Sequence, residues 1–191
     1  MKIVFLFLLG YIIGSISFAY LFTYFLTGLD IRDIGTKNPG AANVARQIGK
    51  KWGIIVWIGD TIKGAGSMAV ARSMGITNEI FLAIVGIFAV LGHCYPVFLR
   101  FKGGKGIATM GGVMLYLAPA VFPFILGFWF IAQLLNPRSK KIVLSEVALF
   151  FLILWQIYPG GFLKLTVSTI LLIITTMFIN RHAIKEIKDA H

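Results

Sequence analysis

The sequence predicts an all-α integral membrane protein with seven transmembrane helices, its N-terminus outside and its C-terminus in the cytoplasm. Three observations indicate this fold class. Of the 191 residues, 58% are hydrophobic and only 13% are charged, about half the charged share of an ordinary soluble domain. The apolar residues form long runs between short polar loops, and backbone in lipid must satisfy its own hydrogen bonds, which favours helices. The basic residues gather in alternate loops.

The apolar runs give the expected helices in order: residues 3–26, 53–72, 80–99, 107–118, 119–136, 142–158 and 163–180. The first is long enough to cross a bilayer, so we interpret it as a retained helix and not as a cleaved signal peptide. Gly10 and Gly14 on it predict close packing against another helix of the same chain, with a dimer interface as the alternative. The fourth run is short and ends at Pro119, which leaves open one long kinked helix over the fourth and fifth runs.

Charge placement favours seven spans over six. With seven spans, most of the 18 lysines and arginines fall in four cytoplasmic segments, as Arg32, Lys37, Arg46, Lys50 and Lys51, then Arg100, Lys102 and Lys105, then Arg138, Lys140 and Lys141, then Arg181, Lys185 and Lys188. Merging the fourth and fifth runs would place the third group outside, against the positive-inside rule. The same rule accounts for the net charge of +11. Nucleic acid is not an expected partner, because no nucleic-acid-binding fold fits between the apolar runs.

Residues 1–191 are expected to form a single membrane-embedded domain, because no repeat or soluble segment interrupts the apolar runs. Cys94 is the only cysteine, so no intramolecular disulfide forms, and we expect it to pack as a small hydrophobe. No spacing of His, Cys and carboxylates suggests a metal site. Asp60 and Lys63 lie three residues apart inside the second span, which favours an ion pair facing the bundle interior over a catalytic role.

Two polar loops contain more polar and charged groups than a membrane scaffold requires. The first of them extends from Asp30 to Arg46. Glycines, asparagines and a threonine stand among charges of both signs. Turns rich in glycine expose N–H groups that bind anions, and arginine binds phosphate bidentately. The loop therefore suits a phosphate, although a solvated basic loop facing lipid headgroups has the same composition.

The second such loop begins at Gly92-His93 and continues through Lys102-Gly103-Gly104-Lys105-Gly106. A glycine-rich turn before a helix N-terminus favours phosphate binding. The loop is not a Walker A motif, because Leu99 stands where that motif has glycine and Gly106 where it has serine or threonine. A structural role is the alternative interpretation of His93.

Both loops fit the pattern of a known family. The matching stretches are Gly14–Leu21, Arg32–Arg46, Gly49–Lys51 and Gly92–Thr109. Through them the chain resembles the PlsY family of bacterial acyl-phosphate:glycerol-3-phosphate acyltransferases over essentially its whole length. The resemblance implies a seven-helix enzyme of the bacterial inner (plasma) membrane with its active site at the cytoplasmic face. Such an enzyme transfers a fatty acyl group from acyl phosphate to the 1-hydroxyl of glycerol-3-phosphate, giving lysophosphatidic acid, in the first step of phospholipid synthesis.

The resemblance also implies the site residues. Those expected to be catalytic are Thr36, His93 and Lys105, and those expected to bind substrate are Arg32, Gly35, Asn38, Gly40, Asn43, Arg46, Gly103, Gly104 and Arg181. Such a basic, glycine-rich site would align the hydroxyl and stabilise the developing oxyanion. No strong side-chain base stands out, so a substrate phosphate oxygen could take the hydroxyl proton. Neither a metal nor another cofactor is expected, and the protein is expected to be a monomer.

The chain departs from the family pattern at predicted cytoplasmic positions. Lys37 stands where glycine is usual, which would strain a tight phosphate loop, and Ala42 replaces a usual threonine. Residues 143–146 differ as well, and the C-terminal motif has Ala183 where asparagine is expected. These changes leave open a paralogue with altered substrate or no activity. An anionic-lipid transporter would share the basic loops but should show inverted repeats and mid-membrane polar groups, and the sequence has no such repeat.

Overall fold

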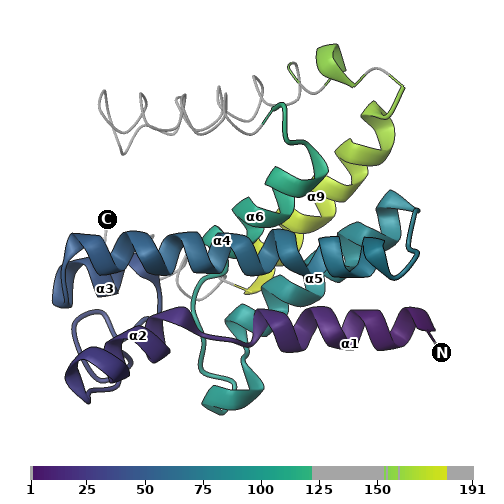
Figure 1. Ribbon diagram of the computed structural model, residues 1–191. Coiled ribbons are helices and arrows are strands. Elements are labelled where there is room, and N and C mark those ends of the chain that lie inside the picture. The colour runs from purple at the N-terminus through teal and green to yellow at the C-terminus, as the bar shows by residue number, and fades with distance from the viewer. Residues whose placement is uncertain (1, 122–152, 154, 159, 180–191) are drawn as a thin grey trace.

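The computed structural model describes residues 2–121, 153, 155–158 and 160–179, and all regular structure in that part of the chain is helical (Figure 1). The elements are α1 (Lys2–Gly14), α2 (Phe18–Thr27), α3 (Ala41–Gln47), α4 (Lys50–Ser73), α5 (Glu79–Cys94), the 3-10 turn η1 (Val97–Leu99), α6 (Ile107–Leu117) and α9 (Phe162–Ile179). The segments Lys2–Thr27, Lys50–Ser73 and Glu79–Leu99 are long and apolar enough to cross a membrane. The predicted spans at 119–136 and 142–158 lie largely outside the described residues.

The first predicted span is apolar but is not one helix. α1 and α2 are separated at residues 15–17, where Ser17 caps α2 by accepting a hydrogen bond from a first-turn N–H. The continuous helix expected over residues 3–26 is therefore wrong at this point. The carbonyl of Ile16, inside the break, accepts a hydrogen bond of 2.7 Å from Nζ of Lys63. Another helix thus satisfies a backbone group that lipid could not.

Small residues bring α1 and α5 into close contact. A Cβ added at Gly14 would collide with the backbone of Ala89, and one added at Gly92 would collide with the backbone of α1. Gly10 lies equally close to Val85. The expectation that Gly10 and Gly14 pack against a helix of the same chain is confirmed.

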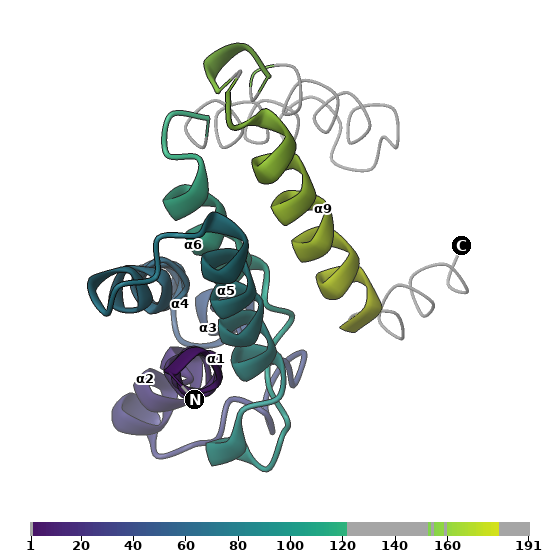
Figure 2. The same cartoon turned by 90° about the vertical axis from the view of Figure 1, so that its right-hand side faces the viewer.

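The remaining helices pack around α4 and α5. Gly64 and Gly112 let α4 and α6 approach each other at the backbone of Thr109 and Thr61, and Gly53 does the same for α3 and α4. α9 packs on α5 and α6 (Figure 2). α1 and α4 run in opposite directions, as Figure 1 shows. α3 was not predicted, because its residues lie in a stretch interpreted as a loop.

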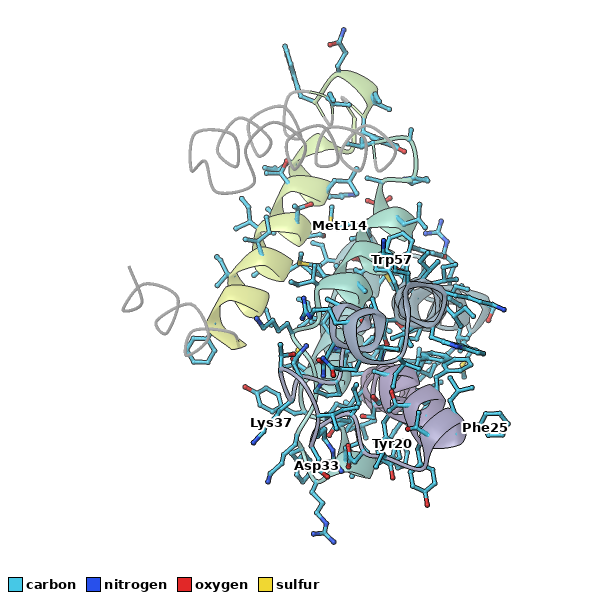
Figure 3. All side chains as sticks on the ribbon, turned by 90° about the vertical axis from the view of Figure 1, so that its left-hand side faces the viewer. Tyr20, Phe25, Asp33, Lys37, Trp57 and Met114 are labelled. Carbon is cyan, nitrogen blue, oxygen red and sulfur yellow. The ribbon has the colours of Figure 1, made fainter. Side chains whose placement is uncertain are left out.

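Large apolar side chains cover the outside of the molecule. Phe25 is 87% exposed and points away from the helices, whereas Asp33 and Lys37 extend from the loop before α3 (Figure 3). Single exposed apolar residues are common on soluble proteins, but here they cover helices of membrane-spanning length. Cys94 is buried in the core cluster with Val90 and Val113, so its predicted role as a small hydrophobe is confirmed.

Candidate active site

Asn43 organises the loop between α2 and α3. The side chain is fully buried in the first turn of α3, and its Oδ1 accepts a hydrogen bond from the Thr36 N–H (3.0 Å). Its Nδ2 donates to the carbonyls of Ile31 (3.2 Å) and Ile34 (3.0 Å). Three backbone groups of the loop are thereby tied to one amide. Asn43 was expected to bind substrate, and the structure places it beneath the loop as the group that shapes it.

The loop turns through left-handed backbone at two positions. Gly35 has a φ of 58°, and an added Cβ would overlap the Asn43 and Gln47 side chains. Lys37 also has a φ of 58°, a conformation that costs a residue with a Cβ about 1–2 kcal/mol. The expectation that Lys37 strains this loop is confirmed at the level of its backbone. The strain arises because lysine occupies a turn that glycine adopts freely.

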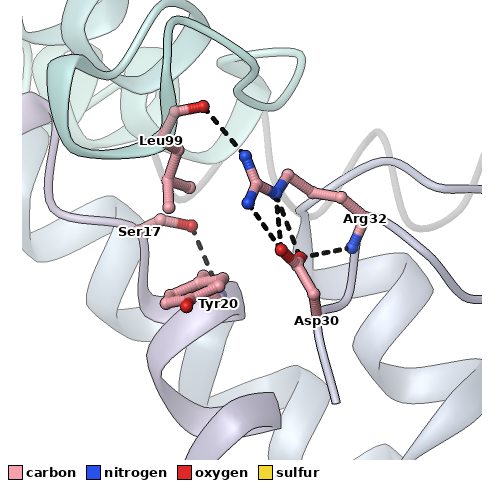
Figure 4. Close-up of polar contacts among 5 residues, drawn as sticks. All are labelled: Ser17, Tyr20, Asp30, Arg32 and Leu99. Carbon is pink, nitrogen blue, oxygen red and sulfur yellow. Dashed lines mark hydrogen bonds and ion pairs between the residues drawn. The ribbon is translucent and has the colours of Figure 1, made fainter.

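Arg32 joins this loop to the second one (Figure 4). Its Nε donates to both carboxylate oxygens of Asp30 at 3.0 Å, and its Nη1 donates to the carbonyl of Leu99 in η1 at 2.8 Å. The guanidinium also lies 5.6 Å from the centre of the Tyr20 ring. The hydrogen bond from Arg32 holds the pKa of the Asp30 carboxyl below its ordinary value. Arg32 was expected to bind substrate, and in this structure its guanidinium links two protein segments.

Gly103 and Gly104 let the second loop run against the end of α5. The Gly103 N–H donates to the Cys94 carbonyl and the Gly104 N–H to the His93 carbonyl, both at 3.1 Å. A Cβ on Gly103 would collide with these carbonyls. The close backbone approach that the glycines allow is thus to α5, and their expected contact with a phosphate stays a prediction. Gly106, which has a φ of 78°, is the N-cap that precedes α6.

The two loops meet at Gly104. A Cβ added there would overlap Nε2 of His93 and would lie 3.0 Å from the carbonyl oxygen of Pro39. Pro39 precedes Gly40, the N-cap of α3, whose N–H donates to the Asn38 carbonyl at 2.9 Å. Pro39 and Gly104, which are more than 50 residues apart in the sequence, therefore lie against each other, and we call the surface that they form the wall. The His93 imidazole contacts the wall at Gly104.

A buried charged cluster lies next to this wall. Oδ1 of Asp60 is 2.8 Å from Nζ of Lys63 and 3.4 Å from Nδ1 of His93, and all three side chains are at most 6% exposed. The predicted ion pair facing the bundle interior is confirmed. Its contact with His93 could not be predicted from the sequence, because the two charges lie on α4 and the imidazole lies on α5. The two charges inside an apolar span were the signal that marked this pair in the sequence, and the structure adds His93 as its neighbour.

The other expected site residues lie at the surface. The side chains of Thr36, Arg46 and Lys105 are exposed, and Asn38 is half-buried. Arg181 lies outside the described residues. Beside the loop, a cavity of about 360 Å³ lies between α3 and the start of α4. It is lined by Ala41, Ala42, Ala45, Lys50, Gly53, Ile54 and Trp57. The site therefore combines exposed basic and hydroxyl groups, a nearby apolar cavity and a buried acid–imidazole pair.

Comparison with known proteins identifies the family to which the chain is similar. The family model described as glycerol-3-phosphate acyltransferase matches residues 4–189. A glycerol-3-phosphate acyltransferase of Pseudomonas paraeruginosa is 39% identical over 169 residues, which are 87% of each chain. One of Bacillus subtilis is 38% identical over 177 residues, 93% of this chain and 86% of that protein.

Solved structures agree in fold. The crystal structure of PlsY (YgiH), an integral membrane glycerol 3-phosphate acyltransferase, in its glycerol 3-phosphate form superposes with a TM-score of 0.80 at 32% identity. The similarity covers 100% of this chain and 94% of that one. The lysophosphatidic acid form of the same protein matches with the same TM-score.

Proposed function

The chain belongs to the glycerol-3-phosphate acyltransferase family, and we propose that it transfers a fatty acyl group from acyl phosphate to the 1-hydroxyl of glycerol-3-phosphate. It is an acyltransferase of phospholipid synthesis and an integral membrane protein. Lysophosphatidic acid and inorganic phosphate are the proposed products. The paralogue and transporter alternatives receive no specific support from the site.

The observation that carries the proposal is the meeting of the two loops at Gly104. Each loop has a composition suited to a phosphate, and this reaction brings two phosphate groups together. Arg32 and Asn43 hold the loops in place, as their hydrogen bonds indicate. Exposed groups beside the wall would then bind the two anions, and the proposed ligands are Thr36, Asn38, Arg46, Lys105 and, from the C-terminal motif, Arg181. The cavity between α3 and α4 offers an apolar place for part of the acyl chain.

The groups have separate proposed roles. Lys105 and Arg46 neutralise phosphate charge, and the Thr36 hydroxyl donates to the acyl donor. Binding both reactants in one orientation lowers the barrier, because the acyl carbon of an acyl phosphate is already activated. Gly35, Gly40, Gly103 and Gly104 keep the backbone close enough to form the wall. The proposed reaction uses no cofactor or metal.

Seven spans with an outside N-terminus remain our proposed topology. α6 and α9 run in opposite directions (Figure 2), which supports a topology with an even number of crossings between them. The two apolar runs between them in the sequence would supply two crossings. The site would then face the cytoplasm at the inner membrane, on the side where most basic residues lie. We propose that the protein works as a monomer.

The direct test is a reaction of the purified protein, reconstituted in lipid vesicles, with acyl phosphate and glycerol-3-phosphate. Mass spectrometry would measure lysophosphatidic acid. We expect product from the parent protein and a loss of at least about 100-fold in turnover for Lys105→Ala, because a charge that stabilises the transition state is removed.

Lys102→Ala is the matched control, since Lys102 is an exposed lysine of the same loop that is not assigned to the site. It should keep most of the parent activity. A parent protein that inserts and binds glycerol-3-phosphate without making product would contradict the acyltransferase proposal. Equal activity in Lys105→Ala and the parent would remove Lys105 from the site.

A further inference from the structure

A turn directly after α5 exposes apolar rings beside a positive charge. The turn comprises η1 and the two residues after it, residues 97–101. Phe98 and Phe101 are 63% and 59% exposed, and Arg100, which lies between them in the sequence, is also exposed. We propose that this turn is a docking surface for an anionic phospholipid of the surrounding bilayer. In this arrangement the two rings lie among the acyl chains just below the headgroups, and Arg100 binds the lipid phosphate.

The backbone of the turn is already hydrogen-bonded within the protein. The N–H groups of Leu99 and Phe101 both donate to the Pro96 carbonyl, at 3.1 and 2.9 Å. The Lys102 N–H donates to the Leu99 carbonyl at 3.2 Å, and this carbonyl also accepts from Arg32 at 2.8 Å. Backbone that enters lipid must have its polar groups paired inside the protein. A turn folded in this way can lie at the edge of the apolar layer without leaving these groups unpaired.

Two neighbouring residues of the turn have left-handed backbone. φ is 54° at Arg100 and 62° at Phe101. This conformation is unfavourable for residues with a Cβ, and it persists only where other interactions favour it. The side chains of both residues are exposed, so the protein itself offers them few contacts. Lipid contacts made by the same two side chains would supply the missing stabilisation.

Two side-chain contacts indicate the depth of the turn. On one side, the Tyr11 hydroxyl donates to the Tyr95 carbonyl at 2.7 Å, and Tyr11 lies within the apolar segment Lys2–Thr27. On the other side, Arg32 of the polar loop before α3 donates to Leu99 (Figure 4). A segment that joins an apolar span to a polar loop lies at the boundary between lipid and water. Surfaces that lie at this boundary combine apolar rings with lysine or arginine, as this turn does.

The turn lies at the edge of the molecule and carries charge of one sign. In Figures 1 and 2 the segment between α5 and α6 reaches the lower edge of the view, away from α9. Residues 93–110 contain no aspartate or glutamate, whereas Arg100, Lys102 and Lys105 are basic. An anionic leaflet attracts basic residues that lie close to its surface. The charge therefore favours an anionic phospholipid over a zwitterionic one.

The level of the turn also sets the level of the loop that follows it. Gly103 begins two residues after Phe101, and its N–H holds the chain to the Cys94 carbonyl at the end of α5. Anchoring the turn at the boundary keeps this loop where a reactant dissolved in lipid and one dissolved in water can meet. That consequence rests on the proposed function, whereas the lipid contact itself does not.

The test is fluorescence quenching in lipid vesicles. Phe98→Cys, in a Cys94→Ala background that removes the only native cysteine, would carry a bimane fluorophore in the turn. Lys37→Cys in the same background is the matched control, because Lys37 extends from the polar loop before α3 (Figure 3). We expect nitroxide groups on the lipid acyl chains to quench the label at position 98 more strongly than the label at position 37. Aqueous iodide should show the opposite order.

A comparison of two lipids tests the role of the charge. The nitroxide is carried by phosphatidylglycerol in one set of vesicles and by phosphatidylcholine in the other, at the same nitroxide content. Phosphatidylglycerol should quench the label at position 98 more strongly, and Arg100→Gln should lower this preference about fivefold, as expected for one basic residue near an anionic leaflet. Arg72→Gln, at an exposed arginine in the last turn of α4, is the matched control and should leave the preference unchanged.

The outcomes are separate from those of the acyltransferase test. Quenching at position 98 by iodide but not by lipid nitroxide would mean that the turn lies in water, where it would suit a protein partner, and would overturn the proposal. Equal quenching by the two lipids, or a preference that survives Arg100→Gln, would overturn the anionic phospholipid as its ligand. None of these measurements requires turnover, so a parent protein that makes no lysophosphatidic acid would contradict the proposed function alone.

Discussion

Two acid–base pairs in this protein have similar chemistry and opposite surroundings. Asp30 and Arg32 form a pair in the loop before α3, where their side chains are 22% and 25% exposed. Asp60 and Lys63 form a pair inside the helix bundle, where the side chains are 2% and 3% exposed. Each pair also contacts a backbone carbonyl of a distant segment, Leu99 in one case and Ile16 in the other.

Because the two pairs differ in exposure to water, they are expected to contribute differently to the stability of the protein. A water-exposed pair contributes about 0–1 kcal/mol, because solvent screens the charges in both the folded and unfolded states. The contribution of the Asp30–Arg32 pair is to hold the loop before α3 against η1, through the hydrogen bond from Arg32 to Leu99. A buried pair can be neutral overall, yet removing one partner leaves an uncompensated charge. We therefore expect the buried cluster to dominate the effects of mutation.

The largest effect is expected from Lys63→Met alone. The substitution leaves Asp60 charged and buried without its cation and removes the donor to Ile16, so we expect a loss of about 3–5 kcal/mol in the free energy of unfolding. Unfolding in mixed detergent micelles measures it. Lys164→Met, at an exposed lysine of α9, should change stability little. A loss for Lys63→Met no larger than that of Lys164→Met would mean that the charges are not energetically coupled.

Asn43→Ala should give the second largest effect. Three hydrogen bonds to the loop are lost, each contributing about 1 kcal/mol, so the free energy of unfolding should fall by about 2–3 kcal/mol. Turnover should fall as well, because Thr36 loses its anchor. Gln47→Ala, an exposed residue of the same helix, is the control. Normal turnover with unaltered stability in Asn43→Ala would contradict the loop-shaping role.

Asp30→Asn should have a smaller effect that depends on pH. The Arg32 hydrogen bond lowers the pKa of Asp30 in the folded protein, so the ionised carboxylate contributes stability above its ordinary pKa and loses it as the pH falls through the lowered one. At neutral pH we expect a loss of at most about 1 kcal/mol, because solvent screens the pair. The parent and Asp30→Asn should converge at acidic pH when thermal midpoints are compared. A gap that widens on acidification would give the opposite sign and reject the assignment.

Lys37→Gly should have the smallest effect. Glycine relieves the strained backbone at φ 58° but gains freedom in the unfolded chain, so the net stabilisation should be within about 1 kcal/mol. Lys102→Gly, at a position without positive φ, should be neutral or destabilising. A loss of stability in Lys37→Gly would show that the lysine side chain matters more than the turn. Turnover measured alongside would show whether this departure from the family pattern affects activity.

Much of the helix content followed from the sequence because apolar runs of sufficient length leave the backbone few alternatives in lipid. α4 and α6 lie where their runs predicted, and Gly10 and Gly14 pack as their spacing indicated. The break at residues 15–17 was not predicted, because two serines among strongly apolar neighbours leave the run apolar enough to cross a membrane. It is stabilised by Lys63, 47 residues further along the chain.

The sequence by itself determined the class of the protein, its family and several of its helices, because composition, motif order and the length of apolar runs can be read along the chain without knowing its contacts. The tertiary structure alone decided which polar groups meet. It turned Asn43 inward beneath the loop, directed Arg32 to Leu99, and placed His93 beside an ion pair carried by another helix. These pairings depend on how helices cross, and helix crossing is set by close packing between residues far apart in the chain. Asp60, Lys63 and His93 therefore come together only because α4 and α5 pack side by side.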